Sequence, residues 1–114
     1  MAECLFCRIV SGTIPAARVY EDDAVLAIRD IDPQAPVHVL LVPKRHLTSV
    51  MDAATLDPAI FGRIASAAAH VARSEAVAAR GFRLLTNVGP EGGQAVPHLH
   101  FHLLGGRLMG WPPG

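Results

Sequence analysis

The sequence predicts an α+β domain with a mainly antiparallel sheet of about five strands, one long helix and one short N-terminal helix. One long stretch, residues 58–79, carries apolar side chains at helical spacing. The other apolar runs are short and are separated by proline, glycine and aspartate, which is typical of strands and turns. With 114 residues, 51% of them hydrophobic, the chain can bury one core. We therefore expect residues 1–114 to form a single domain.

The long helix has recognisable end signals. Asp57 is a good N-cap, and Pro58 suits the first helical position. Leu56 could pack on Phe61 across the cap, and Gly81 is a natural C-terminal stop. The buried stripe of this helix is expected to comprise Leu56, Ile60, Ile64, Ala68 and Val71.

The remaining elements follow from turn residues and apolar runs. A short helix is expected within residues 6–14, ending at Gly12. Strands are expected over residues 18–21, 24–30, 37–42, 82–87 and 97–104. Residues 88–96 then form a glycine-containing loop, and residues 107–114 form a tail rich in proline and glycine.

Charge and hydropathy exclude several classes of partner. Lysine plus arginine and aspartate plus glutamate each number 10, and no basic run occurs, so no nucleic-acid partner is expected. The apolar runs are too short to span a bilayer, so no membrane partner is expected. The start of the chain, residues 1–4, has no basic stretch leading into an apolar one, and a cytoplasmic location is the default expectation.

Three histidines alternate with apolar residues near the C-terminus. On a strand, His98, His100 and His102 would project from one face at intervals of roughly 6–7 Å. Imidazole is the side chain whose ordinary pKa lies between pH 5 and 8, so one ring can attack while a neighbour moves a proton. The alternative is a solvated polar sheet face. We favour a catalytic strip, because half of the chain's 6 histidines lie in this segment, next to the glycine loop.

Neighbouring segments offer further polar groups. In residues 87–95, glycines would let backbone amides approach a phosphate, and Asn87 and Gln94 would add neutral donors; a plain turn is the alternative. Asp30 could accept hydrogen bonds from a ribose diol, although a turn capped by Asp32 explains the same residues. His38 lies in an apolar strand, where it is either structural or bonded to a strip histidine.

These features together resemble the histidine triad (HIT) family, and within it the Hint branch of histidine triad nucleotide-binding proteins. The resemblance rests on the strip from His98 to Leu104 and covers nearly the whole chain. The other matching segments are residues 14–16, 20–23, 30–36, His38, 42–44, 92–94, 105–107 and 111–114.

The resemblance implies a HIT-like fold and hydrolysis of purine nucleoside 5'-phosphoramidates. Carried onto this chain, His100 attacks phosphorus and becomes nucleotidylated, while His102 contacts the phosphate and serves in proton transfer. His38 and His98 support this relay. The expected nucleotide-binding residues are Asp30 at the ribose, Ile31 beside the nucleoside, and Asn87, Gly93, Gln94 and the Ala95 amide on the phosphate side.

The resemblance also implies a homodimer whose two sheets join, with the tail around Trp111 reaching toward the partner's site. Two departures are visible. Ala95 stands where some relatives have serine, which would change rate or amine preference. Pro97 stands where an aromatic residue is common, which would change the rim of the pocket.

A structural zinc ion is a further implication. Cys4 and Cys7 form a CxxC pair that suggests a metal or redox pair before a disulfide. By resemblance to bacterial triad proteins, the other two ligands would be His46 and His98. The alternative is two thiols that pack the first helix. No cofactor is expected to be required for catalysis.

Other functions remain open at this point. The three strip histidines could bind one catalytic metal ion, or the chain could be a non-catalytic purine nucleotide-binding module. Dinucleoside polyphosphate hydrolases and nucleotide transferases of the same superfamily are less favoured, because the hydrolases usually carry glutamine where this chain has His102.

Overall fold

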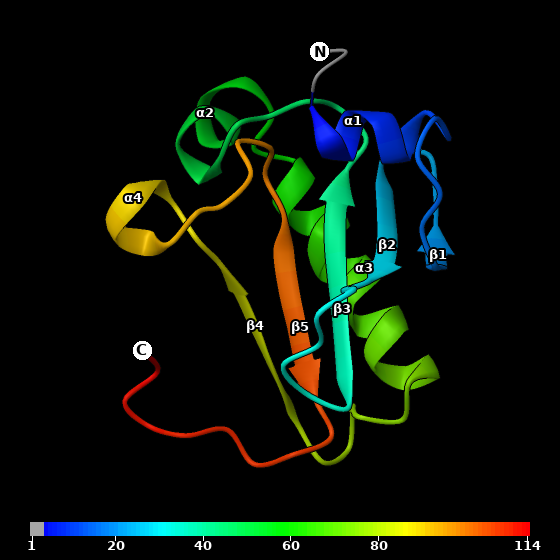
Figure 1. Ribbon diagram of the computed structural model, residues 1–114, viewed down its shortest axis with the longest axis vertical. Coiled ribbons are helices and arrows are strands. Elements are labelled where there is room, and N and C mark those ends of the chain that lie inside the picture. Colours follow the sequence, from blue (N-terminus) through cyan, green and yellow to red (C-terminus); the bar gives the residue numbers. More distant parts are fainter. Residues whose placement is uncertain (1–3) are drawn as a thin grey trace.

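A five-stranded antiparallel sheet forms the centre of the computed structural model, which describes residues 4–114 (Figure 1). Its strands lie in the order β1-β2-β3-β5-β4, and every neighbouring pair is antiparallel. The strands are β1 (Arg18–Glu21), β2 (Val25–Arg29), β3 (Val37–Pro43), β4 (Phe82–Thr86) and β5 (Phe101–Gly105). The helices are α1 (Leu5–Val10), α2 (Val50–Leu56), α3 (Ile60–Ser74) and α4 (Gly89–Gly92). The α+β prediction is confirmed.

The two faces of the sheet are covered differently. Helix α3 lies behind the sheet in Figure 1 and buries Ile64 and Val71 against Leu41 and Leu103. The short helix α1 lies on the opposite face, where Phe6 packs with the apolar residues Ile9, Leu26, Ile28, Leu40 and Val42. The second face is only partly covered, so polar side chains on it can reach solvent or a ligand.

The long helix predicted over residues 58–79 is observed as α3 and is shorter at both ends, and a separate helix, α2, precedes it. Asp57 is the C-cap of α2, and α3 begins at Ile60 without a side-chain cap. Leu56 is 57% exposed, so it does not belong to the buried stripe, and the predicted staple is wrong. Helix α2 was missed, although Ser49 and Asp52 form a capping box that marks its start.

The predicted end of the long helix at Gly81 is also wrong. Helix α3 ends at Ser74, and Ala76 adopts a left-handed φ of 61°. The Val77 amide donates to the Ala72 carbonyl at 2.9 Å, and Val77 is buried. This is a Schellman termination, with alanine where glycine is usual. Ending the helix in this way depends on the burial of Val77, and the local sequence does not show whether Val77 is buried.

The last strand begins later than predicted. Expected over residues 97–104, it is observed from Phe101, so His98 and His100 precede it. The register pairs Leu41 with Phe101, which would bring Pro43 opposite Leu99. Proline has no N–H to give to a ladder, and the Leu99 amide donates instead to the Leu47 carbonyl at 2.6 Å.

The other differences are small. Helix α1 covers Leu5–Val10, whereas the prediction was a helix within residues 6–14 ending at Gly12. The loop of residues 88–96 contains one helical turn, α4. The first four strands agree with prediction to within one residue at each end. Among residues 4–114, no helix has both the length and the apolar character needed to cross a membrane. Residues 1–3, part of the segment that argued against a signal peptide, lie outside the described residues.

Candidate functional site

The three strip histidines lie on the sheet face opposite α3. Leu99 and Leu103, which alternate with them, are buried in the core on the α3 side. His102 pairs with Leu40, a residue of the cluster around α1. The His100 and His102 ring centroids are 5.2 Å apart. The alternation therefore places the three rings on one face even though only His102 lies within β5.

His100 has one ring nitrogen engaged. Its Nδ1 lies 2.7 Å from the His98 carbonyl oxygen, which can only accept, so Nδ1 carries the proton. The Nε2 atom then carries the lone pair of a neutral ring, as nucleophilic attack requires. Phe6 packs edge-on against the ring with centroids 4.9 Å apart, and Thr86 donates to the His100 carbonyl at 2.7 Å. His100 is 8% exposed, so its orientation is well constrained.

His38 fixes the tautomer of His102 in the same way. The Gln34 amide donates to His38 Nδ1 at 3.0 Å, so a neutral His38 carries its proton on Nε2. That Nε2 lies 2.9 Å from His102 Nδ1 and 3.5 Å from Asp30 Oδ2. His102 therefore accepts at Nδ1 and carries its own proton on Nε2.

Burial keeps this pair neutral at pH 7. Burial, together with the neighbouring His100 and His38 rings and against the opposing effect of Asp30, lowers the pKa of His102 to about 4. Burial also lowers the pKa of His38, against the opposing effect of Asp30. At rest the pair therefore forms a neutral hydrogen-bonded chain.

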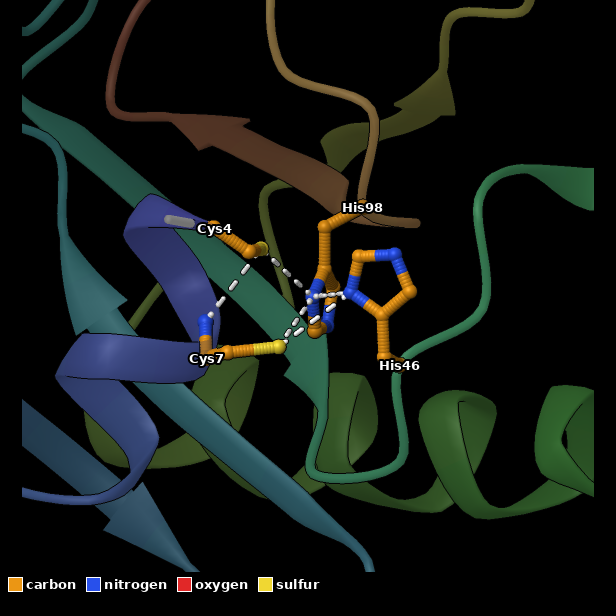
Figure 2. Close-up of side chains that lie close together, drawn as sticks. All are labelled: Cys4, Cys7, His46 and His98. Carbon is orange, nitrogen blue, oxygen red and sulfur yellow. Dashed lines mark hydrogen bonds between the residues drawn. The ribbon is translucent and has the colours of Figure 1, made fainter. Parts of the chain in front are cut away.

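A second cluster lies next to the strip and shares His98 with it. Cys4, the N-cap of α1, and Cys7 within that helix face His46, which follows β3, and the His98 ring (Figure 2). His98 Nε2 lies 2.9 Å from the Pro43 carbonyl oxygen and must donate to it. Its Nδ1 lone pair thus points at Cys4 Sγ (3.3 Å), Cys7 Sγ (3.6 Å) and His46 Nδ1 (3.1 Å).

The chemistry of this donor set fits zinc. A tetrahedral site with Zn–N and Zn–S bonds near 2.1 and 2.3 Å separates its donors by about 3.4–3.8 Å. The contacts above, together with 3.2 Å from Cys7 Sγ to His46 Nδ1, approach that spacing. Burial raises the pKa of the Cys7 thiol, so a metal ion would have to displace its proton. The four residues could therefore hold a Cys₂His₂ zinc ion.

Asp30, His38 and His102 also converge, but they fit a metal poorly. Their donor atoms lie within 4.8 Å of one another. Because the Gln34 amide occupies His38 Nδ1, the His38 proton must reside on the nitrogen that would bind the ion. This group is therefore better suited to holding a proton than to holding a metal ion.

Hydrogen bonds of the Gln94 side chain hold the glycine loop of residues 88–96 in its conformation. The Gln94 side-chain amide donates to the Thr48 and Val96 carbonyls at 2.7 and 3.1 Å and accepts from the Gly89 amide at 3.1 Å. In this arrangement Gln94 shapes the loop, rather than offering free donors. Gly93 supports the turn with a φ of 77°.

The remaining candidate residues differ in exposure. Asn87 is half-buried just after β4, and Ala95 is exposed. Ile31 is fully exposed, close in sequence to Asp30, and Trp111 is 84% exposed. These side chains are available to a ligand or to another chain.

Sequence reasoning missed several groups that shape the site. Phe6 lies between the two cysteines in sequence and contacts the rings of both His98 and His100. Its place inside the CxxC pair was an available signal. The other groups are the Thr86 hydroxyl, the Gln34 amide and the Pro43 carbonyl. The Gln34 amide and the Pro43 carbonyl are backbone groups, which occur in every residue, so no sequence pattern could identify these two.

Comparison with known proteins gives a consistent result. A family model described as HIT domain matches residues 11–109. The chain is 44% identical over 108 residues to the purine nucleoside phosphoramidase of Escherichia coli K12, covering 95% of this chain and 91% of that protein. It is 49% identical over 114 residues to the 14 kDa zinc-binding protein of Brassica juncea (98% and 100% covered).

Two further relatives extend the comparison. Adenylylsulfatase HINT1 of Arabidopsis thaliana is 50% identical over 112 residues, covering 96% of this chain and 76% of that protein. Among solved structures, a HIT family hydrolase from Legionella pneumophila Philadelphia 1 superposes with a TM-score of 0.94 at 48% identity, covering 98% of this chain and 100% of that chain.

Proposed function

Because this chain belongs to the HIT domain family of hydrolases, we propose that it hydrolyses purine nucleoside 5'-phosphoramidates through a nucleotidyl intermediate on His100. The observation that carries the proposal is the hydrogen bond from His100 Nδ1 to the His98 carbonyl. It leaves Nε2 as an unprotonated nucleophile on a ring held by Phe6. The similarity to a purine nucleoside phosphoramidase supports the choice of substrate.

The reaction proceeds by two displacements at phosphorus. His100 Nε2 forms a bond to phosphorus as the P–N bond breaks, and the amine leaves with one proton. Water then cleaves the P–Nε2 bond, releases the nucleoside monophosphate and returns a proton to the site. The carbonyl at His100 Nδ1 stabilises the positive charge that develops on the ring during attack.

His102 supplies the proton that the amine takes away. An anionic phosphate next to its ring favours the imidazolium form, so the substrate enters together with the proton that its leaving group needs. In that form His102 Nδ1 donates to His38 Nε2, and the His38 proton moves to Nδ1 as the Gln34 amide bond opens. His38 holds His102 in position through the 2.9 Å bond at Nδ1. Asp30 and the exposed Ile31 form the side that receives ribose and base, and the loop with Asn87, Gly93 and Ala95 lies on the phosphate side.

The other functions receive less support. For a catalytic metal shared by the strip, the three rings would have to converge, yet His98 turns its Nδ1 toward Cys4 and Cys7. Adenylyl sulfate is the second candidate substrate, since a similar protein is named an adenylylsulfatase and the same nucleophile could displace sulfate. A non-catalytic nucleotide-binding module needs no arranged nucleophile.

Substitution of the nucleophile tests the proposal. Wild type and His100→Ala are assayed with adenosine 5'-phosphoramidate and with adenylyl sulfate. We expect turnover to fall by at least about 10³-fold in the variant, with AMP binding retained, because only the nucleophile is removed. Brief reaction of wild type with labelled substrate should place an acid-labile label on His100. Equal rates in the two proteins would rule out this mechanism, and faster turnover of adenylyl sulfate would reassign the substrate.

We also propose that Cys4, Cys7, His46 and His98 bind one structural zinc ion. The spacing of their donors and the similarity to a zinc-binding protein support this assignment. Metal analysis of purified protein should give one zinc per chain. Four protein donors would fill a tetrahedral zinc site and leave no position for substrate, so these residues would hold the ion in a structural role.

We further propose that two copies associate through the edge strand β4. This strand is the outermost in the sheet order, and its Phe82 and Leu84 side chains are 38% and 37% exposed. The C-terminal segment, tied to β4 by the 2.8 Å bond from Arg83 to the Gly110 carbonyl, exposes Leu108 and Trp111 beside it. Pairing of two β4 strands would cover this edge and join the two sheets.

A further inference from the structure

His98 takes part in two groups of residues, the cysteine/histidine cluster and the histidine strip. Its ring faces the cysteines and His46, while its backbone carbonyl accepts the proton of His100 Nδ1 at 2.7 Å. The zinc-binding side chain and the group that sets the tautomer of the nucleophile are therefore parts of one residue. Any rotation of the His98 peptide changes both.

The backbone around His98 has few other restraints. His98 and His100 precede β5, whose ladder begins at Phe101. What holds this segment is the Leu99 amide bond to Leu47, the His98 amide bond to Val96 at 2.9 Å, the Thr86 hydroxyl bond to the His100 carbonyl at 2.7 Å, and the contacts of the His98 ring. The ring donates from Nε2 to the Pro43 carbonyl at 2.9 Å and presents Nδ1 to the cysteines and His46. These two sets of ring contacts together fix how the side chain and peptide of His98 are turned.

A second contact connects the same two centres. Phe6, on α1 between Cys4 and Cys7, meets the His98 ring at 5.8 Å and the His100 ring at 4.9 Å between centroids. Any change in how the two cysteines hold α1 would therefore move a ring that packs on His100. Both connections run from the metal ligands to the same imidazole.

We propose that the Cys₂His₂ centre positions the nucleophile. When one metal ion binds all four donors, the His98 carbonyl and Phe6 hold the His100 ring so that Nδ1 carries the proton and Nε2 is free. This inference builds on the proposed role of His100 and on the proposed zinc ion. The Cys₂His₂ centre only orients the His100 ring. It touches neither the substrate nor the reacting atoms, so its loss should affect kcat far more than KM.

His46 offers the cleanest test, because it is a ligand from a loop and contacts the other donors without contacting His100. Two variants are compared with wild type: His46→Ala removes one donor, and His46→Cys restores a four-donor set. Ile9→Ala, on the same short helix, is the matched control, since it removes buried apolar packing but no donor. Far-UV circular dichroism and an amide correlation spectrum establish that each protein is folded.

Four quantities are measured on each protein: zinc per chain, the His100 tautomer from two-bond ¹H–¹⁵N ring correlations above neutral pH, kcat and KM. Wild type, His46→Cys and Ile9→Ala should hold one zinc and show a single Nδ1–H tautomer at His100. His46→Ala should lose zinc and show mixed tautomers, and its kcat should fall by about tenfold or more with KM changed by less than about threefold.

Several results would overturn the inference. A folded, zinc-free His46→Ala protein with an unchanged His100 tautomer and kcat would do so, as would failure of zinc-loaded His46→Cys to restore the tautomer. If His46→Ala still binds zinc, the Cys7→Ser/His46→Ala variant removes a second donor, and the same criteria apply. The tautomer is read without substrate, so absence of phosphoramidate turnover in wild type would reject the proposed function and leave this test intact.

Discussion

The proton positions in this site are set residue by residue, and backbone groups set most of them. A carbonyl can only accept and an amide can only donate, so the His98 carbonyl and the Gln34 amide decide the tautomers of His100 and His38. Through His38 the same logic reaches His102. The result is one ring with a free Nε2 lone pair beside another with an Nε2 proton.

The depressed pKa of His102 makes a prediction about acid stability. Its ordinary pKa is 6.5, and in the folded chain it is about 4. Between these values the unfolded chain binds a proton that the folded chain does not, so stability falls as pH drops from about 6.5 to 4. For a partly buried ring this contributes on the order of 2–3 kcal/mol.

Urea unfolding of wild type and His102→Gln at several pH values between 7 and 4 measures this effect. Wild type should lose more stability than the variant across the interval, since glutamine does not titrate. Parallel curves for the two proteins would show that His102 does not carry the acid sensitivity. The comparison also separates this effect from protonation of the cysteine and histidine cluster, which both proteins share.

At the scale of elements, glycine and alanine occupy unexpected positions in α3 and in the turn that follows it. Gly62 lies in the helix interior with no atom within 4 Å of where a Cβ would stand. Ala76, which ends the helix, has the positive φ that suits glycine. Each position has the residue that the other would favour, so the helix is less stable than its packing alone would allow.

Exchanging these residues should stabilise the chain at both positions. Gly62→Ala removes backbone freedom from the unfolded chain and should add about 0.5–1 kcal/mol. Ala76→Gly relieves the left-handed strain and should add about 1 kcal/mol. The reverse change at an exposed interior position, Ala65→Gly, should lower stability by about 0.5–1 kcal/mol. Chemical denaturation measures all three, and a destabilised Ala76→Gly would show that the termination is not strained.

For the whole molecule, the exposed edge strand β4 is the feature that bears on assembly. A hollow of about 750 Å³ lies between this strand, the end of α3 and the C-terminal segment. It is lined in part by Phe82, Leu84 and Leu108, and the strip histidines lie elsewhere. We interpret it as part of the surface between two copies, rather than as the substrate site. Exposed apolar side chains beside an open strand edge suit an association surface, and the charged residues Glu75, Arg80, Arg83 and Arg107 also line the hollow.

Leu84→Lys should therefore weaken self-association. A charge on the edge strand opposes pairing with a second β4, and we expect the dissociation constant to rise by at least about 100-fold. Leu56→Lys, at an exposed leucine of α2, is the matched control and should leave association unchanged. Sedimentation velocity over a range of concentrations measures both. A monomeric wild type, or equal behaviour of the two variants, would refute the proposed dimer.

The sequence by itself determined the fold class, four of the five strands to within one residue, and the shared face of the three histidines. These follow from alternation and turn chemistry, which act over a few residues. It also supplied the four candidate zinc ligands by resemblance. The bounds of α3 were not determined locally, because Asp57 ends α2 instead of capping α3, and burial of Val77 sets where α3 ends.

Only the tertiary structure decided which nitrogen of each imidazole carries the proton, and that the His98 carbonyl accepts from His100 while the His98 ring faces the cysteines. Cys4 and His98 are separated by 94 positions in the chain, and Gln34 meets His38 through its backbone amide. Contacts of this kind depend on the packing of α1 over the sheet and on backbone groups that every residue possesses. A local pattern of side chains cannot encode them.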